Sequence, residues 1–472
     1  MSKFICNDSE TSQNYIFDKE QFALNDVVAH LVRLEIFLCC RDKLYFYNSD
    51  KGFFIPLPEN EIWFYICRYV SRGVSECFEP KDIKKLIAKL KINLDLHFDS
   101  DKFDTYDDLI NINNGVLNVN TGKLIPKKCE YYFTSNIDAA LLEDVSLDDC
   151  PTFKKFYETS LCGDEKSLTL LLQIIGYLCC NDSSAKKAFM FIGEKNCGKS
   201  KILEFISRLI GKDNVCNIPL HKLGNRFNVA ELSRNKVNIQ AELSLDPLRE
   251  IETFKNAVGG DTLCGEYKGE NLFYFKNKCK LLFAGNGVPA LKTQDTTQAF
   301  VSRLIFLIFP KEIPVDERDP KLVDKLYAER DVIFSLAIKE LLKLIQSRYK
   351  FEVPVLSQVR MNSFMEQNNQ IDDFINEHCL FGSEYKVFSR DLYYAYKKFC
   401  KDNCLFAHSQ TAFLDAVSMC EGVVRSKMRI NGEQLRGFKG IGLNMQDSDV
   451  SYNNFADTKT TVPSVPERSK LL

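Results

Sequence analysis

The sequence predicts an α/β fold with a parallel-rich sheet that carries a phosphate-binding loop. Two observations favour this class. Residues 188–192 (AFMFI) form an apolar strand pattern that runs into a glycine-punctuated loop and then into a helix with apolar residues at helical spacing. Three more short apolar segments, at 236–240, 279–285 and 303–309, alternate with loops and helical patterns. Such alternation favours a sheet that is covered by helices on both faces.

Length and composition limit the remaining possibilities. A chain of 472 residues is too long for one ordinary core and predicts two to four domains. The formal net charge is −2, so any binding of a polyanion must depend on a local basic patch. The 18 cysteines form no CxxC pair and indicate a reducing cytoplasm. We expect no membrane span and no metal clip.

The region before the predicted sheet reads as a mixture of helices and strands. Residues 61–74 and 80–92 have amphipathic helix patterns, and residues 113–127 alternate around an Asn-Thr-Gly turn, as in a hairpin. Residues 150–180 predict two helices broken at Gly163, and residues 319–349 return to helix. The predicted domains are an N-terminal α+β domain (1–145), a helical collar (146–184), the α/β domain (185–350), a C-terminal module (359–445) after a linker (350–358), and a disordered tail (446–472).

The glycine-punctuated loop fits the pattern G-x-x-x-x-G-K-[ST] of nucleotide-binding proteins. Its backbone N–H groups and the start of the following helix would wrap the phosphates of ATP. Lys199 would reach the β- and γ-phosphates, and Ser200 would bind Mg²⁺. The thiol of Cys197 stands at a variable position, so we expect it to be incidental. The alternative is an ordinary strand-turn-helix with a solvated lysine. The expected nucleotide-binding residues are Gly193, Glu194, Lys195, Asn196, Cys197, Gly198, Lys199 and Ser200.

Polar residues follow the neighbouring predicted strands. Glu242 comes after the strand at 236–240 and could orient water or hold Mg²⁺, although a solvated carboxylate is the simpler interpretation. Asn286 follows the strand at 279–285 and could contact the γ-phosphate or the attacking water, or belong to a plain turn. Arg303 opens the last strand and could reach a phosphate across a subunit boundary, or form a surface ion pair.

A predicted hairpin lies between Glu242 and Asn286. Residues 254–280 contain a helix that ends at Gly259-Gly260, followed by a hairpin that turns at 268–271. Tyr267 and Lys268 near its tip could contact nucleic acid, because lysine binds phosphate and aromatic rings stack on bases. A solvated hairpin is the commoner outcome for such a sequence.

Taken in order, these motifs resemble the superfamily 3 helicases of the AAA+ class. The resemblance is to the branch of phage, plasmid and poxviral primase-helicases, without the primase domain. It rests on GEKNCGKS, the strand that ends in Glu242, VGGDTLCGEYKGE (258–270) and LLFAGNGVP (281–289). The region around NNGVLNVNTGKLIP is similar to the domain that precedes the motor in this family, and residues 371–417 resemble its winged-helix-like C-terminal module.

The resemblance implies an AAA+ core and an ATP-dependent replicative DNA helicase of a virus, phage, plasmid or integrated element. It implies catalytic roles for Lys199, Glu242 and Asn286, and for Arg303 as a finger acting on the neighbouring subunit of a hexamer. Tyr267 and Lys268 would track single-stranded DNA, with travel from 3′ to 5′ and unwinding of forked DNA. The implied partners are a separate primase or a replication initiator. The single acid at 242, where relatives have a pair, leaves a second contact to Mg²⁺ open.

Two other functions remain open at this point. An origin-binding or helicase-loading ATPase would bind DNA without processive unwinding, and a small-molecule P-loop kinase would show no response to DNA. The C-terminal module could read duplex DNA or bind protein. Its basic residues are Lys397, Lys398, Lys401, Arg425, Lys427 and Arg429.

Overall fold

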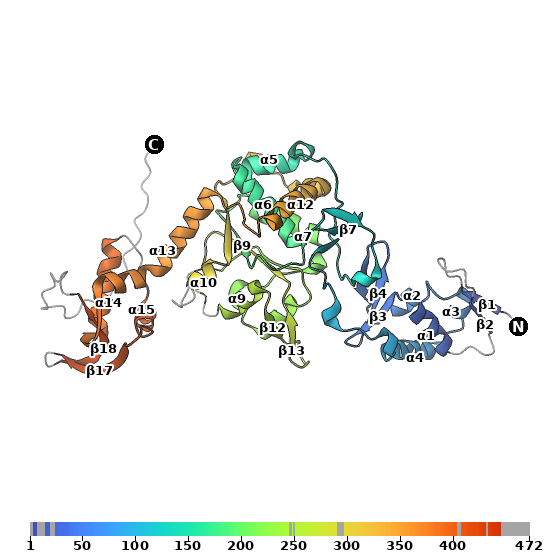
Figure 1. Cartoon of the computed structure of the whole chain (residues 1–472), viewed down its shortest axis with the longest axis horizontal. Coiled ribbons are helices and arrows are strands. Elements are labelled where there is room, and N and C mark those ends of the chain that lie inside the picture. Colours follow the sequence, from blue (N-terminus) through green and yellow to red (C-terminus); the bar gives the residue numbers. More distant parts are fainter. Residues whose placement is uncertain are drawn as a thin grey trace. The chain divides into compact units, whose positions relative to one another are not determined.

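The computed structural model divides into two compact units, residues 1–368 and 369–472, which are described separately (Figure 1). The predicted tail 446–472 lies outside the described part of the chain. The described residues are 3–6, 15–18, 24–244, 248, 251–289, 297–403, 407–430 and 433–444.

The first unit begins with small antiparallel sheets and short helices around one apolar core. Val27, Phe37, Phe46 and Leu86 belong to this core. β1 pairs with β2, and β3, β4 and β5 form a meander. The elements are β1 (Lys3–Cys6), β2 (Tyr15–Asp18), α1 (Leu24–Arg33), β3 (Phe37–Cys40), β4 (Lys43–Asn48), β5 (Phe53–Pro56), α2 (Ile62–Ile66), α3 (Arg72–Ser75) and α4 (Pro80–Lys91).

The helix predicted over 61–74 is wrong as one element. It is interrupted because the side chain of Ser71 accepts a hydrogen bond from the N–H of Val74 and starts the separate helix α3. The helix predicted over 80–92 is confirmed as α4, where Glu79 and Asp82 form a capping box and Pro80 occupies the first turn.

A second meander and two helices lead to the central sheet. The predicted hairpin is confirmed: β7 (Gly115–Asn118) pairs with β8 (Lys123–Ile125), and β6 (Leu109–Ile112) pairs with β7 on its other edge. The predicted break at Gly163 is also confirmed, between α5 (Pro151–Ser160) and α6 (Glu165–Cys179).

The centre of the unit is a five-stranded sheet in which every neighbouring pair is parallel, with the order β10-β11-β14-β9-β15. The four predicted strands agree with it to within one residue, and only the two-residue β10 was not predicted. The strands are β9 (Ala188–Gly193), β10 (Val215–Cys216), β11 (Val237–Gln240), β14 (Lys280–Gly285) and β15 (Leu304–Phe309).

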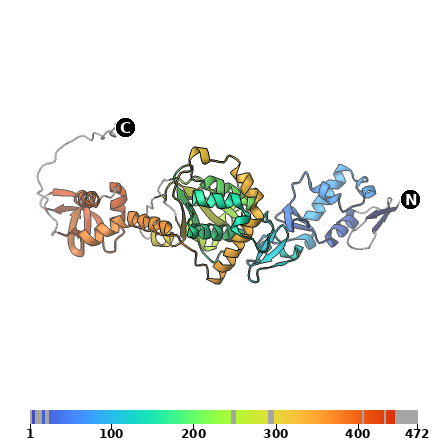
Figure 2. The same cartoon turned by 90° about the horizontal axis from the view of Figure 1, so that it is seen from above.

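Helices cover both faces of this sheet, as predicted (Figures 1 and 2). Successive strand residues alternate between two cores, because side chains of a strand point to opposite faces. Phe189 and Phe191 pack in a core with α6, α7 (Lys199–Ile210), α11 (Leu322–Ala328) and α12 (Arg330–Gln346). Ala188, Met190 and Ile192 pack in the other core, with α8 (Arg226–Leu232), α9 (Glu252–Gly259) and α10 (Thr297–Val301).

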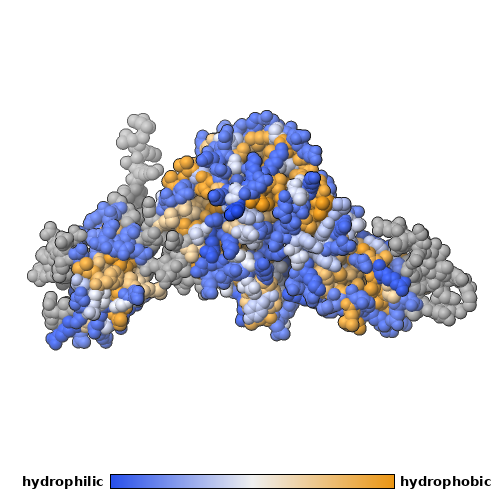
Figure 3. Space-filling model, in the orientation of Figure 1, coloured by the Kyte–Doolittle hydropathy of each residue, from blue (hydrophilic) through white to orange (hydrophobic). Residues whose placement is uncertain are grey.

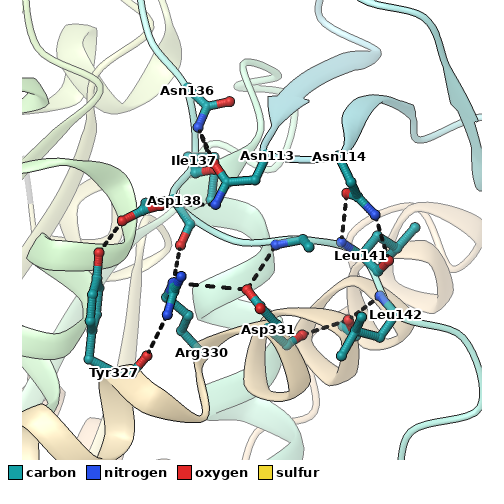
Figure 4. Close-up of polar contacts among 12 residues, drawn as sticks. Asn113, Asn114, Asn136, Ile137, Asp138, Leu141, Leu142, Tyr327, Arg330 and Asp331 are labelled. Atoms are coloured by element: carbon teal, nitrogen blue, oxygen red, sulfur yellow. Dashed lines mark hydrogen bonds and ion pairs between the residues drawn. The ribbon is translucent and has the colours of Figure 1, made fainter. Parts of the chain in front are cut away.

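A polar network joins the segment 136–142 to α11 and α12 (Figure 4). Asp138 accepts hydrogen bonds from the hydroxyl of Tyr327 and from Asn113 Nδ2, the latter at 2.9 Å. Its main chain accepts from Arg330 Nε at 2.8 Å and donates to the carbonyl of Leu209, near the end of α7, at 2.8 Å. The helix after the phosphate loop is thereby tied to the region before the sheet.

The second unit combines helices with a three-stranded antiparallel sheet of order β16-β18-β17. The linker predicted over 350–358 is wrong from residue 355 onward, because α13 begins there and continues into this unit. Phe374, Tyr396, Phe413 and Phe438 are among its core residues. Its winged-helix character stays a prediction. The elements are α13 (Val355–His378), β16 (Cys379–Phe388), α14 (Ser389–Asp402), α15 (Gln410–Val417), β17 (Val424–Ile430) and β18 (Glu433–Leu443).

Candidate active site

The predicted phosphate loop connects the end of β9 at Gly193 to the start of α7 at Lys199. Asn196 and Gly198 have positive φ angles of 60° and 97°. A Cβ atom on Gly198 would lie 2.5 Å from Ser160 Oγ and 2.9 Å from Phe156 Cε2, both in α5. Glycine is therefore required at 198 both for the backbone conformation and for the space.

Lys199 lies inside this loop. Its Nζ donates to the carbonyl oxygens of Gly193 at 2.7 Å and Glu194 at 2.6 Å, and lies 3.2 Å from Cys197 Sγ. The residue is only 8% exposed. The ammonium group is thus held at the start of α7, where a helix presents backbone N–H groups and a favourable partial charge to an anion.

The first turn of α7 is available for an anion. Gly198 is the N-cap residue and supplies no side-chain cap. Ser200, in the same turn, is exposed. An uncapped helix start beside an exposed hydroxyl and a held ammonium group suits a phosphate chain with its bound cation.

Cys197 has a structural role that its variable position in the loop pattern did not indicate. Its side chain is buried, at 1% exposure, and Sγ donates to the carbonyl of Glu194 at 3.1 Å. The same carbonyl accepts from Lys199. The thiol therefore supports the inner side of the loop.

Glu242 and Asn286 follow strands whose carboxyl ends meet at the phosphate-loop edge of the sheet. β14 lies between β9 and β11, and the register places Gly285 beside Ile192 and Gln240 beside Phe283. Neighbouring strands are about 4.8 Å apart, so the ends of β9 and β11 are separated by roughly 10 Å. Glu242 and Asn286 are both exposed at this edge. The tertiary structure thus brings three sequence-predicted elements together.

A magnesium ion at this edge of the sheet would need only a few protein ligands. Among the described residues, no group of three or more His, Cys, Asp or Glu side chains could hold a metal ion. Mg²⁺ commonly uses one or two protein oxygens together with substrate phosphates and water. The exposed hydroxyl of Ser200 and the exposed carboxylate of Glu242 have the chemistry for that arrangement.

A contact between the loop and the segment that follows β15 was not predicted from the sequence. Asn196 Nδ2 donates to Glu312 Oε1 at 3.0 Å, and the N–H of Ile313 donates to the carbonyl of Asn196 at 3.0 Å. Arg318 pairs with Glu312 at 2.8 Å. The segment after β15 therefore holds the tip of the loop. No sequence signal links positions that are 116 residues apart.

Arg303 lies at the opposite edge of the sheet from the phosphate loop. Its carbonyl accepts from the N–H of Ala188, at the start of β9, while the loop follows the end of that strand. Six strand residues span about 20 Å, so Arg303 is too far from the loop of the same chain to contact it. NH1 donates to Ala299 at 2.7 Å, and Nε has no partner among the described residues.

Lys187 accompanies Arg303 at that edge and was not predicted. Its Nζ donates to the carbonyl of Ser302. Burial and the charge of Arg303 together lower the pKa of Lys187. Two adjacent cations at one edge favour an anionic partner.

The hairpin between Glu242 and Asn286 is formed by β12 (Thr262–Gly265) and β13 (Phe273–Lys276). Lys268 is exposed in its loop, as predicted. Tyr267 is half-buried instead of exposed: its hydroxyl donates to Ala230 at 3.0 Å, and the Arg234 guanidinium lies 3.8 Å from its ring centroid. The ring and hydroxyl therefore already have protein partners.

The exposed aromatic residue of the hairpin is Tyr274, at 71%. Lys276 is exposed on the same strand, two residues later, and so lies on the same face. The strand alternation F-Y-F-K could have indicated this choice, since Phe273 and Phe275 occupy the opposite, partly buried face.

Two family matches cover parts of the chain. Residues 191–303 match a family of unknown function, DUF5906, and this segment runs from β9 to Arg303. Residues 70–162 match a family described as D5 N terminal like. Most of the candidate site thus lies in the segment that matches a family of unknown function, and the segment that matches D5 N terminal like precedes it.

Two solved structures of the NrS-1 C-terminal region resemble the chain at low identity. An apo structure aligns with a TM-score of 0.47 and 12% identity over 90% of this chain and 100% of that chain. The A form apo structure gives 0.46 and 11% over 88% and 99%. Likeness at this level carries no argument about activity. Separately, none of the described helices is long and apolar enough to cross a membrane.

Proposed function

We propose that the chain is an ATP-dependent DNA helicase of replication, from a virus, phage, plasmid or integrated element. One observation carries the proposal. The loop that holds Lys199 shares one edge of a parallel sheet with Glu242 and Asn286, which follow β11 and β14. A hairpin with exposed Lys268 and Tyr274 is inserted in the sequence between these two strands. This arrangement supports a chain that both binds a nucleotide and contacts nucleic acid.

Each residue at the sheet edge has a role that follows from its position. Lys199 and the N–H groups at the start of α7 bind the β- and γ-phosphates of ATP. Ser200, with help from Glu242, would hold Mg²⁺, and the ion would supply positive charge beside the phosphates. Glu242 orients the attacking water, and Asn286 senses the γ-phosphate. The loop residues 193–198 provide backbone contacts.

Arg303 acts on the ATP of a neighbouring subunit in a ring, which the resemblance implies to be a hexamer. Its distance from its own phosphate loop supports a role in trans, and Lys187 adds a second cation at the same edge. An arginine in such a position stabilises the charge of the transferred phosphoryl group, worth about 10³–10⁵ in rate.

The hairpin binds single-stranded DNA. Lys268 and Lys276 contact phosphates, while the ring of Tyr274 stacks on a base or sugar. Tyr267 supports the hairpin from behind through Arg234 and Ala230. The D5-like match over residues 70–162 supports the primase-helicase resemblance of the region before the motor. A separate primase or initiator would complete the system.

The test is hydrolysis and strand displacement by the purified chain. We expect ATP hydrolysis that rises with single-stranded DNA and displacement of one strand from forked DNA. Both should be lost in Lys199→Ala and Glu242→Gln, whereas Lys84→Ala, an exposed change on α4, should retain both. Hydrolysis with neither DNA stimulation nor displacement would refute the proposal. Stimulation without displacement would favour the loading ATPase.

A further inference from the structure

Half of the ten lysine and arginine residues in the described part of the second unit lie on its β-hairpin, and four others lie on α14. β17 and β18 together carry five lysine and arginine residues and one acid, Glu433. All five cationic residues are exposed, namely Arg425, Lys427, Arg429, Arg436 and Lys439. By contrast, α15 contains no lysine or arginine and has one acid, Asp415.

The register of the hairpin places four of these cations on one face. Lys427 pairs directly with Arg436, and β17 pairs with β18 without a bulge from Val424 to Ile430. Arg425, Lys427 and Arg429 alternate along β17 and therefore share that face. From Arg425 to Arg429 the row is about 13 Å long. Like charges directly opposite each other destabilise a sheet. A bound anion would therefore relieve the repulsion between Lys427 and Arg436.

The positive charge of this face is partly neutralised at the end that contains Arg425. Arg425 NH2 donates to Asp415 Oδ1 at 2.8 Å, and its guanidinium lies 5.4 Å from the ring centroid of Phe438. Among the described side chains of the unit, no ion pair of Lys427 or Arg436 is found, in contrast to the pair formed by Arg425. Lys427 and Arg436 follow next along this face, beyond Arg425. In Figure 3 the lower edge of this unit, where Figure 1 draws β17, is hydrophilic.

The helix α15 is poorly suited to the same ligand. Its exposed positions include Thr411 and Asp415, and Met419 follows at 67% exposure. Asp415 would repel phosphate if it were not already paired with Arg425. The charge distribution thus separates two elements of the unit that could enter a DNA groove.

We propose that the β17–β18 hairpin, through Lys427 and Arg436, binds the phosphate backbone of duplex DNA. A rigid two-stranded ribbon fits the major groove of a duplex, and duplex DNA offers one phosphate charge per about 1.7 Å of axis. Binding of single strands relies on exposed aromatic rings, but the described aromatic residue on this face, Phe438, is fully buried. This inference does not depend on the activity proposed for the first unit.

The test measures binding of the full chain to a blunt-ended duplex by fluorescence anisotropy over a series of salt concentrations. The double variant Lys427→Ala/Arg436→Ala should bind more weakly. The slope of log affinity against log salt should fall by about 1.8, because each lost phosphate contact contributes roughly 0.9. Its thermal midpoint should not fall, because both side chains are exposed and their mutual repulsion is removed, and its ATP hydrolysis and single-strand affinity should stay unchanged.

Matched variants separate position from net charge. Lys84→Ala/Lys85→Ala removes two exposed cations from α4 and should leave duplex affinity unchanged. The exchange Lys427→Arg/Arg436→Lys keeps both charges and should retain binding. An unchanged slope in the hairpin double variant would overturn the proposal. So would a loss confined to Lys398→Ala/Lys401→Ala on α14, or an equal loss in the α4 control.

Discussion

Lys199 Nζ donates a hydrogen bond of 2.6 Å to the main-chain carbonyl oxygen of Glu194. The phosphate-loop lysine is therefore ordered by the loop itself. Ordering a long side chain costs up to about 2 kcal/mol, and a lysine that is already held avoids most of that cost when an anion binds. The loop and its lysine behave as one unit, so changes in the loop backbone should affect nucleotide binding as strongly as loss of the amine.

Gly198→Ala should abolish nucleotide binding. The added Cβ meets Ser160 and Phe156, and φ at this position is 97°. The matched control is Gly211→Ala at the other end of α7, where φ is 92°. Both changes should lower the free energy of unfolding by roughly 1 kcal/mol or more. Only Gly198→Ala should lose binding of a fluorescent ATP analogue. Equal binding by the two variants would contradict the proposed loop geometry.

Cys197→Ala should keep ATP hydrolysis within a few-fold of the parent chain while reducing stability by about 1 kcal/mol, because a buried thiol loses its hydrogen bond to Glu194. Thermal melting and steady-state hydrolysis, measured side by side, check this. Loss of hydrolysis as complete as in Lys199→Ala would show that the thiol acts directly on the nucleotide.

Subunit mixing should reveal whether Arg303 acts in trans. Arg303→Ala and Lys199→Ala should each lose hydrolysis, the former by about 10³–10⁵-fold. An equimolar mixture should recover part of it, since an intact phosphate loop of one variant can face an intact Arg303 of the other. Size-exclusion chromatography checks that both variants assemble. No recovery from assembled mixtures would assign Arg303 a role within its own subunit.

Tyr274→Ala and Tyr267→Ala should have opposite effects. Tyr274 is 71% exposed, so its removal should weaken single-strand binding by about 1–3 kcal/mol without lowering the thermal midpoint. Tyr267 contacts Ala230 and Arg234, so its removal should lower the thermal midpoint. Anisotropy with single-stranded DNA and thermal melting distinguish them. Selective loss of DNA binding in Tyr267→Ala alone would restore the assignment made from the sequence.

Acid should weaken the network around Asp138. Burial by itself would raise the pKa of this carboxyl, but hydrogen bonds from Tyr327 and Asn113 and the charge of Arg330 lower it on balance from 3.8. A lowered folded-state pKa adds stability that is fully present above the unfolded value and is lost as the pH falls through the folded value. Tyr327→Phe should therefore flatten the loss of stability below about pH 4, measured by denaturant unfolding; an unchanged acid limb would contradict it.

The local elements near the nucleotide were predictable because their signals are short-range. The loop pattern, the apolar strand before it and the periodic helix after it lie within about two dozen consecutive residues. The strands at 236–240, 279–285 and 303–309 were predicted to within one residue, since a strand buried on both faces is a nearly continuous apolar run. The break between two helices at Gly163 was indicated by the glycine, and in the structure Asp164 caps the second helix.

Errors arose where pattern alone could not indicate partners. The amphipathic run at 61–74 has helical spacing throughout, yet the cap formed by Ser71 divides it. Residues 355–358 had a linker's composition but start α13. Tyr267 was chosen over Tyr274 because the alternation of F-Y-F-K was not used, and the packing of Arg234 and Ala230 against Tyr267 shows that its ring already has partners.

The sequence by itself determined the parallel α/β core, the phosphate loop and the candidate acid, amide and arginine, because each is encoded by neighbouring residues. The tertiary structure decided which of these share an edge: strand order places Glu242 and Asn286 beside the loop and Arg303 at the far end of the sheet. It also decided that Glu312 holds Asn196 and that cations of the second unit gather on one hairpin face. Strand order and register depend on contacts between distant residues, which local pattern does not contain.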